Sequence, residues 1–304
     1  MKARGKYRPA PRVLISVAST VIFLLLNQLA AAGQEKEKSI ALVFSPGPGQ
    51  TLIYNLSSRM SAEGKSFLGK SLSLNATASG EIDVAIRQVS KENVFTELTS
   101  PGLQVALHAL DELDEFTLAA TAENPVQVIF DKTGRIRDVK NVAALEERNV
   151  LNFSIMDVLR NYLPSYPDRP VSVGDSWKDH KRMLIPFQGM NLAVEFDIIF
   201  LLNLVLPSPD GRLALISATC AVTLSGSRNL EEAVGSFEGK GVGSGNVNFL
   251  IDHGYFTQYR LDYNISGAMV VRRAGTKLLE WPVTLSASAD LSLLEKREPL
   301  LNQN

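Results

Sequence analysis

The chain has few residues that could cross-link it or perform catalysis: one cysteine and three histidines among 304 residues. Cys220 alone cannot form an internal disulfide, so packing must stabilise the fold. It alternates with apolar residues and has no adjacent histidine or basic residue, which predicts a small buried hydrophobe and not a reactive thiol. His108, His180 and His253 lack the spacing of zinc ligands. We therefore expect no metal site and no cofactor.

Charge is also sparse, and after the amino terminus it forms no block of one sign. Removing the five basic residues of positions 1–32 from the 31 in the chain leaves 26, against 32 acidic residues. A nucleic-acid-binding surface would need a basic stripe or a high isoelectric point. The composition therefore argues against a nucleic-acid partner.

The five basic residues precede an apolar run at 13–26 and three alanines at 30–32. This order is typical of an export signal with a small-residue cleavage site. We expect residues 1–32 to be a cleaved signal peptide and the remainder to fold in the periplasm or outside the cell. An uncleaved amino-terminal anchor stays open, because residues 13–32 match the roughly 20 residues of a spanning helix.

Period-two alternation of apolar and polar residues dominates the rest of the chain. One face of residues 190–206 carries only apolar side chains, and residues 72–86, 255–265 and 279–293 repeat the pattern. Such segments predict long, twisted antiparallel strands with one covered face. The fold class is therefore mainly β, a curved sheet or half-barrel. Residues 190–206 exceed a common strand length, so we expect a bend or bulge within them.

The mid-chain region changes to a helical period. An apolar stripe at residues 149–163, including Leu151, Ile155, Leu159 and Tyr162, predicts a helix that covers the sheet. It separates an amino-terminal β half (33–141) from a carboxy-terminal β half (171–294), with 142–170 as helical linker and 295–304 as polar tail. Each half carries an Asp-to-Gly turn, at 131–134 and 252–254, which suggests two pseudo-repeats.

The most unusual segment places glycines at every second position. In an extended chain they share one face with large apolar residues, and the whole set is Phe237, Gly239, Gly241, Gly243, Gly245, Val247 and Phe249. This face could form the floor of a groove for an apolar ligand. The alternative is that the glycines only provide sheet curvature, or form a loop.

A Gly-Asp-Ser sequence at 174–176 invites comparison with serine hydrolases. Those enzymes need a partner Asp-x-x-His, which this chain lacks, and a serine without a base is a weak nucleophile. Catalysis at Ser176 is therefore the weaker alternative. An outer-membrane β-barrel is another, because alternating strands are its signature too.

Residues 170–177 (Pro-Val-Ser-Val-Gly-Asp-Ser-Trp), with a helical segment before them and long strands after, resemble an uncharacterised family of bacterial exported proteins and lipoproteins. That resemblance implies an envelope location and no established activity. The lipoprotein members carry an acylated cysteine that this chain lacks. The expected architecture is also similar, more distantly, to periplasmic lipoprotein carriers.

The leading hypothesis is a non-enzymatic exported envelope protein. Its curved sheet would shelter an apolar ligand, such as a lipid, or an apolar segment of a partner. Contact with a membrane surface stays open. Exposed strand edges permit self-association, but the sequence does not determine an oligomeric state.

Overall fold

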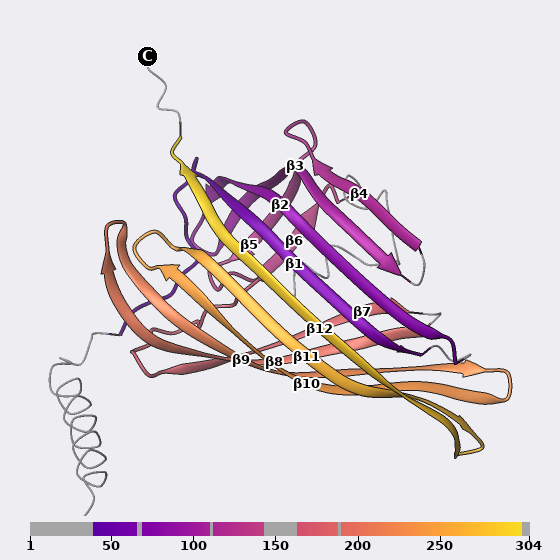
Figure 1. Cartoon of the computed structure of the whole chain (residues 1–304). Coiled ribbons are helices and arrows are strands. Elements are labelled where there is room, and N and C mark those ends of the chain that lie inside the picture. The colour runs from indigo at the N-terminus through magenta and orange to yellow at the C-terminus, as the bar shows by residue number, and fades with distance from the viewer. Residues whose placement is uncertain (1–38, 66–68, 110–111, 143–162, 188–189, 300–304) are drawn as a thin grey trace, which may run out of the picture. The chain divides into compact units, whose positions relative to one another are not determined.

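Twelve antiparallel strands form one sheet (Figure 1). The computed structural model describes residues 39–65, 69–109, 112–142, 163–187 and 190–299, and from Ile40 onward they belong to one compact unit. The strands are β1 (Thr51–Lys65), β2 (Ser71–Val89), β3 (Asn93–Ala109), β4 (Glu112–Ala120), β5 (Val126–Asp131), β6 (Ile136–Lys140), β7 (Ser176–Phe187), β8 (Met190–Ser208), β9 (Gly211–Leu230), β10 (Ala233–Leu250), β11 (Tyr255–Arg273) and β12 (Thr276–Arg297).

The sheet is open and curved. Its strand order is β6-β5-β3-β2-β1-β12-β11-β10-β9-β8-β7, with β4 also paired to β3. Strands β1 to β6 therefore occupy one side and β7 to β12 the other, and the pair β1–β12 joins them. The predicted antiparallel, curved β-sheet is confirmed. Whether the two sides are repeats stays a prediction.

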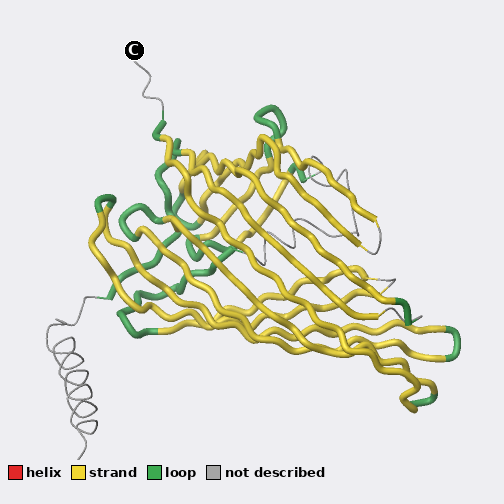
Figure 2. The backbone as a smooth tube through the Cα atoms, in the orientation of Figure 1, coloured by secondary structure: helices red, strands yellow, loops and turns green. Residues whose placement is uncertain are grey.

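Strands and loops account for all the described ranges, and these contain no helix (Figure 2). Accordingly, no described helix has the length and apolar character needed to span a membrane. The predicted covering helix, with Leu151, Ile155, Leu159 and Tyr162, lies outside the described residues.

The strands form where the sequence alternates. In β8 every second residue from Leu192 to Leu202 is buried, which confirms the predicted apolar face. The pairing of β8 with β9 then shifts between Leu202 and Leu204. This irregularity lies within residues 190–206, where a bend or bulge was predicted. A bulge reverses the side to which the following side chains point. Leu204 and Leu206, predicted on the buried face, are consequently exposed, and that part of the prediction was wrong.

Two irregular segments, residues 40–50 and 163–175, close one end of the sheet. They pair with each other through an isolated bridge between Ile40 and Val171. The amide of Phe44 donates to the carbonyl of Lys132 at 2.9 Å, and the amide of Tyr166 donates to that of Thr133 at 2.8 Å. We call these segments the straps and this end of the sheet the strap end.

Both predicted Asp-to-Gly turns are confirmed and lie at the strap end. The turn from β5 to β6 is held by Asp131, whose Oδ1 accepts from the amides of Thr133 at 2.9 Å and Arg135 at 3.0 Å. The turn from β10 to β11 meets the first strap, because the amide of Ser45 donates to the carbonyl of Gly254 at 2.9 Å. The straps therefore fasten turns from both sides of the sheet.

Candidate ligand site

The glycine segment forms the middle of β10 and is a strand, not a loop. A Cβ atom at Gly241 would lie 2.0 Å from the carbonyl oxygen of Asn264, and one at Gly245 would lie 2.1 Å from that of Arg260. Both oxygens belong to β11, the next strand in the sheet. The glycines thus let the β11 backbone approach closely, which is the curvature role considered above.

Aromatic side chains pack against each other inside this bend. The rings of Phe196 in β8 and Tyr263 in β11 meet edge to face, with their centroids 5.4 Å apart. Phe237, Val247 and Phe249 are buried in the same core. The proposed groove over Gly239, Gly241, Gly243 and Gly245 stays a prediction, and the geometry places accessible apolar surface elsewhere on the same face.

Burial of this face decreases away from the strap end. In β1, Leu52 and Tyr54 are buried, whereas Leu56 and Met60 are half-buried. In β12, residues 287, 289 and 291 are buried, 281, 283 and 285 are half-buried, and 276–280 are exposed. The inner face is therefore packed at the strap end and partly accessible at the opposite end, which we call the mouth.

Small side chains line the inner face on β2, β1 and β12; Ala76, Ala78 and Ser58 are half-buried, and Ala287 and Ala289 are buried. The pairing aligns Ala76 with Met60 and Ala287, and Ala78 with Ser58 and Ala289. Leu74 and Leu56 lie on the same face to either side of these rows, and both are half-buried. Apolar surface that neighbouring elements cover only in part is typical of binding sites. We define this surface as the inner strip.

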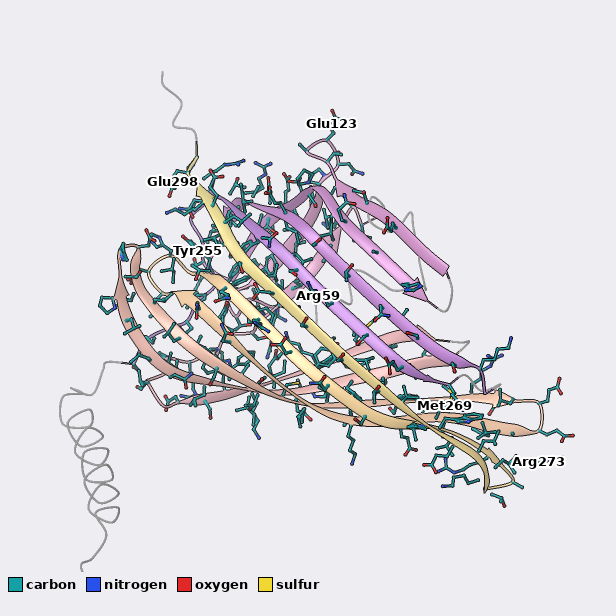
Figure 3. The ribbon with its side chains drawn as sticks, in the orientation of Figure 1. Arg59, Glu123, Tyr255, Met269, Arg273 and Glu298 are labelled. Atoms are coloured by element: carbon teal, nitrogen blue, oxygen red, sulfur yellow. The ribbon has the colours of Figure 1, made fainter. Side chains whose placement is uncertain are left out.

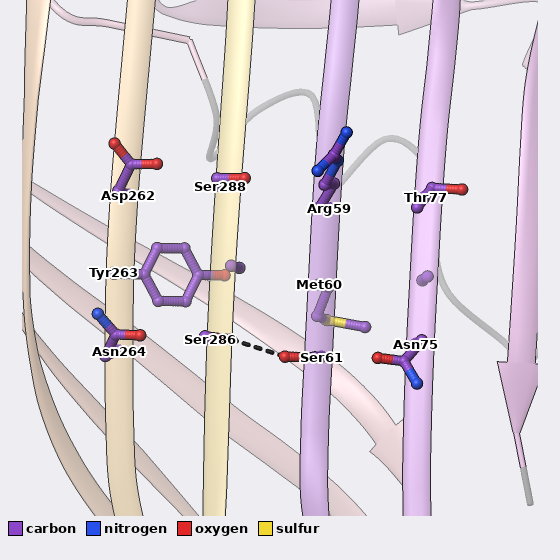
Figure 4. A pocket seen from close by; sticks show the side chains of 12 residues that line it. Arg59, Met60, Ser61, Asn75, Thr77, Asp262, Tyr263, Asn264, Ser286 and Ser288 are labelled. Carbon is purple, nitrogen blue, oxygen red and sulfur yellow. Dashed lines mark hydrogen bonds between the residues drawn. The ribbon is translucent and has the colours of Figure 1, made fainter.

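A hollow of about 430 Å³ is lined by residues of β2, β1, β12 and β11 (Figure 4). Directly paired polar residues line it in two rows: Asn75, Ser61, Ser286 and Asn264, and Thr77, Arg59, Ser288 and Asp262. The hydroxyls of Ser61 and Ser286 hydrogen-bond at 2.7 Å. The two rows suit polar groups and water, and the row between them, Ala76, Met60, Ala287 and Tyr263, also lines the hollow.

A buried charged cluster, which the sequence reasoning missed, lies on the inner face of the edge strand β7. Asp179 and Lys181 are both buried, with Asp179 Oδ2 and Lys181 Nζ 3.5 Å apart. Ser165 Oγ donates to Asp179 Oδ2 at 2.6 Å and Arg135 Nη2 donates to Asp179 Oδ1 at 2.9 Å. The alternation of Trp177, Asp179 and Lys181 could have revealed two charges on an apolar face.

This cluster fastens the second strap beneath β7. Lys181 Nζ donates to the carbonyl of Leu163, and Trp177 Nε1 donates to that of Ser165 at 2.9 Å. Arg135 belongs to the turn between β5 and β6, at the other edge of the strand order. The cluster therefore connects the two edges of the open sheet through side chains, and its polar groups satisfy one another.

Burial lowers the pKa of Lys181 from 10.5 to about 8, although the Asp179 carboxylate opposes the shift. The unfolded chain holds this proton up to pH 10.5, whereas the native chain releases it near pH 8. The lysine contribution to the free energy of unfolding should therefore rise with pH across this interval.

Urea unfolding of the native chain and of Lys181→Met, just below pH 8 and near pH 10, tests this pH dependence. From the lower to the higher pH, the free energy of unfolding of the native chain should increase relative to that of Lys181→Met. An unchanged difference between the two proteins would contradict the assignment.

The residues considered above for reactive chemistry, Cys220, Ser176 and His180, lie on separate parts of the sheet or far apart along one strand. Cys220 is buried, as predicted, and burial raises its pKa to about 11. Ser176 begins β7 after a turn in which the Ser172 amide donates to Asp175 Oδ2 at 2.9 Å. His180 lies four residues farther along β7, roughly 13 Å away at the rise of a strand. Its Nδ1 lies 2.9 Å from Asp197 Oδ1.

No protein-family model and no curated protein matches the chain. The resemblance to bacterial exported proteins therefore stays a prediction that rests on residues 170–177.

Solved structures show a distant likeness. The sheet is similar to a structure titled "Lipid-protein interactions in lipovitellin", with a TM-score of 0.42 and 12% identity, covering 86% of this chain and 27% of that chain. It is also similar to OccK5 (OpdH) of Pseudomonas aeruginosa, with a TM-score of 0.23 and 6% identity, covering 83% of this chain and 100% of that one. OmpF of Salmonella typhi in complex with daunomycin has a TM-score of 0.20 and 6% identity, covering 79% and 97%. The chain thus spans about a quarter of the lipovitellin chain, and TM-scores this low carry no functional argument.

Proposed function

We propose that this protein is a non-enzymatic exported protein that shelters an apolar ligand of the lipid class against the inner strip. The observation that carries the proposal is the unequal burial of one apolar face. At the strap end Leu52 and Tyr54 are buried, whereas toward the mouth the half-buried residues include Leu56, Met60 and Leu74.

The shape of the inner strip supports a slender ligand. Ala76, Ala78 and Ser58 are half-buried, and their side chains reach only one or two atoms beyond the backbone, so they would let a slender chain lie close to the sheet. Leucines on either side would contact a chain lying in that space. Binding sites for apolar molecules are typically concave and lined mainly by apolar side chains.

The straps support a site that is partly preformed. The buried cluster of Asp179 and Lys181 fixes the second strap, and the bridge at Ile40 and Val171 fixes the first to it. A ligand entering at the mouth would then need little reorganisation at the strap end. Preorganisation of this kind increases affinity by lowering the cost of ordering.

Displacement of a fluorescent fatty acid tests the proposal. The variant Ala76→Phe/Ala78→Phe fills the inner strip and should weaken binding at least tenfold, since about 1.4 kcal/mol of lost contact produces that factor. The matched control is Ser79→Phe, because residue 79 points to the opposite face of the same strand.

Loss of binding in the double variant alone would support the proposed site. Two outcomes would overturn it: the native chain fails to bind the probe, or Ser79→Phe weakens binding as much as the double variant does. Circular dichroism should show unchanged β content in all three proteins, so that a folding defect is not mistaken for a binding defect.

A further inference from the structure

We infer that the hairpin arm formed by residues 270–281 docks the protein onto an anionic lipid surface. The arm comprises the end of β11, the turn at 274–275 and the beginning of β12. Figure 3 shows Arg273 at its tip, at the opposite end of β11 from Tyr255 and the strap end. The arm is therefore at the mouth end of the sheet.

Large apolar side chains on the arm are exposed to solvent. Leu278 is 52% exposed and Leu279 is 46% exposed, and Val234 on the adjoining end of β10 is 43% exposed. A shift in pairing between Val271 and Arg272 leaves Leu278 as the extra residue of β12. These side chains add nothing to the described core, so core packing does not explain them.

Three basic residues precede these leucines in the arm. Residues 270–281 contain Arg272, Arg273 and Lys277 against Glu280, which is three positive charges minus one, a net charge of +2, in a chain whose net charge is −1. Arg272 Nη1 donates to the neutral hydroxyl of Ser236 at 3.2 Å. Apolar side chains among basic residues are what a lipid surface with anionic headgroups binds.

Two of the cations already have carboxylate partners. Arg273 pairs with Glu232 of the neighbouring turn, and Lys277 pairs with Glu280. The Arg273 side chain is 59% exposed and that of Lys277 is 55% exposed. Exposed ion pairs are weak, so lipid phosphates can compete for both cations. Long basic side chains can also reach the headgroups while their stems lie along apolar surface.

Co-sedimentation of the full chain with lipid vesicles tests the inference. We expect the native protein to bind vesicles of phosphatidylcholine mixed with phosphatidylglycerol more tightly than vesicles of phosphatidylcholine alone. Leu278→Ser/Leu279→Ser should weaken binding to the mixed vesicles by at least about tenfold, because two side chains no longer leave water. Arg272→Gln/Lys277→Gln should remove most of the preference for the mixed vesicles.

The matched control is Leu294→Ser. Leu294 is 56% exposed at the strap end of the same strand, among two acidic and two basic residues at 295–298. This variant should bind vesicles as the native chain does. The inference is overturned if the native chain does not bind mixed vesicles, or if the leucine variant binds as well as Leu294→Ser. Fatty-acid displacement should be unchanged in the leucine variant, so failure of vesicle docking and failure of the ligand site give different results.

Discussion

Replacing Asp179 by asparagine is expected to lower the free energy of unfolding by about 3–5 kcal/mol, the cost of breaking a buried ion pair. The substitution keeps the size of the side chain and removes its charge. Lys181 would remain buried without its carboxylate partner, and Arg135 would lose its ion pair across the sheet edges. Urea unfolding followed by circular dichroism measures the loss.

Two comparison variants separate the buried charge from a general effect of mutation. Glu195→Gln removes an exposed ion pair with Arg182 on neighbouring strands, and should cost about 0–1 kcal/mol. Asp179→Leu/Lys181→Met replaces both buried charges with apolar groups and should recover much of the stability that Asp179→Asn loses. If Asp179→Asn proves as stable as Glu195→Gln, the cluster does not fasten the second strap.

Gly241→Ala should destabilise the protein by about 3 kcal/mol, at the upper end of the usual cost of overpacking. Its new methyl group would lie 2.0 Å from the carbonyl oxygen of Asn264, and a backbone atom cannot move aside as a side chain can. Strand β11 would have to move away from β10, which would flatten the bend that brings Tyr263 against Phe196.

Gly102→Ala in β3 is the matched control, because its methyl group would come no closer than 3.4 Å to any atom, here Thr117 Cγ2. Its unfolding midpoint should stay near that of the native chain. If Gly241→Ala unfolds at the same urea concentration as Gly102→Ala, the close approach of β10 and β11 does not determine the curvature.

Alternation in the sequence was sufficient to predict four of the strands, β2, β8, β11 and β12. Residues 190–206 show why, because a strand with one buried face and one solvent-exposed face requires a sequence period of two. The expected bulge was also found in this strand. Its position could not be predicted, and so Leu204 and Leu206 were assigned to the wrong face. A bulge depends on the pairing of two strands, which one strand's sequence does not contain.

The role of the glycines depends on the same kind of distant pairing. The sequence shows that Gly241 lacks a side chain, but not that the backbone at Asn264 occupies the vacant space. Likewise, Asp179 and Lys181 are adjacent on one strand face, yet their partners Ser165 and Arg135 come from separate segments. The local sequence pattern therefore predicted strands, whereas the tertiary contacts decide where accessible apolar surface remains on the sheet.

Native mass spectrometry of the protein purified without detergent tests the central claim most directly. The account predicts an added mass that organic extraction removes and identifies as a lipid, and that is absent from Ala76→Phe/Ala78→Phe but present in Ser79→Phe. A native chain that carries no apolar molecule, and takes up none when fatty acid is supplied, would contradict the account.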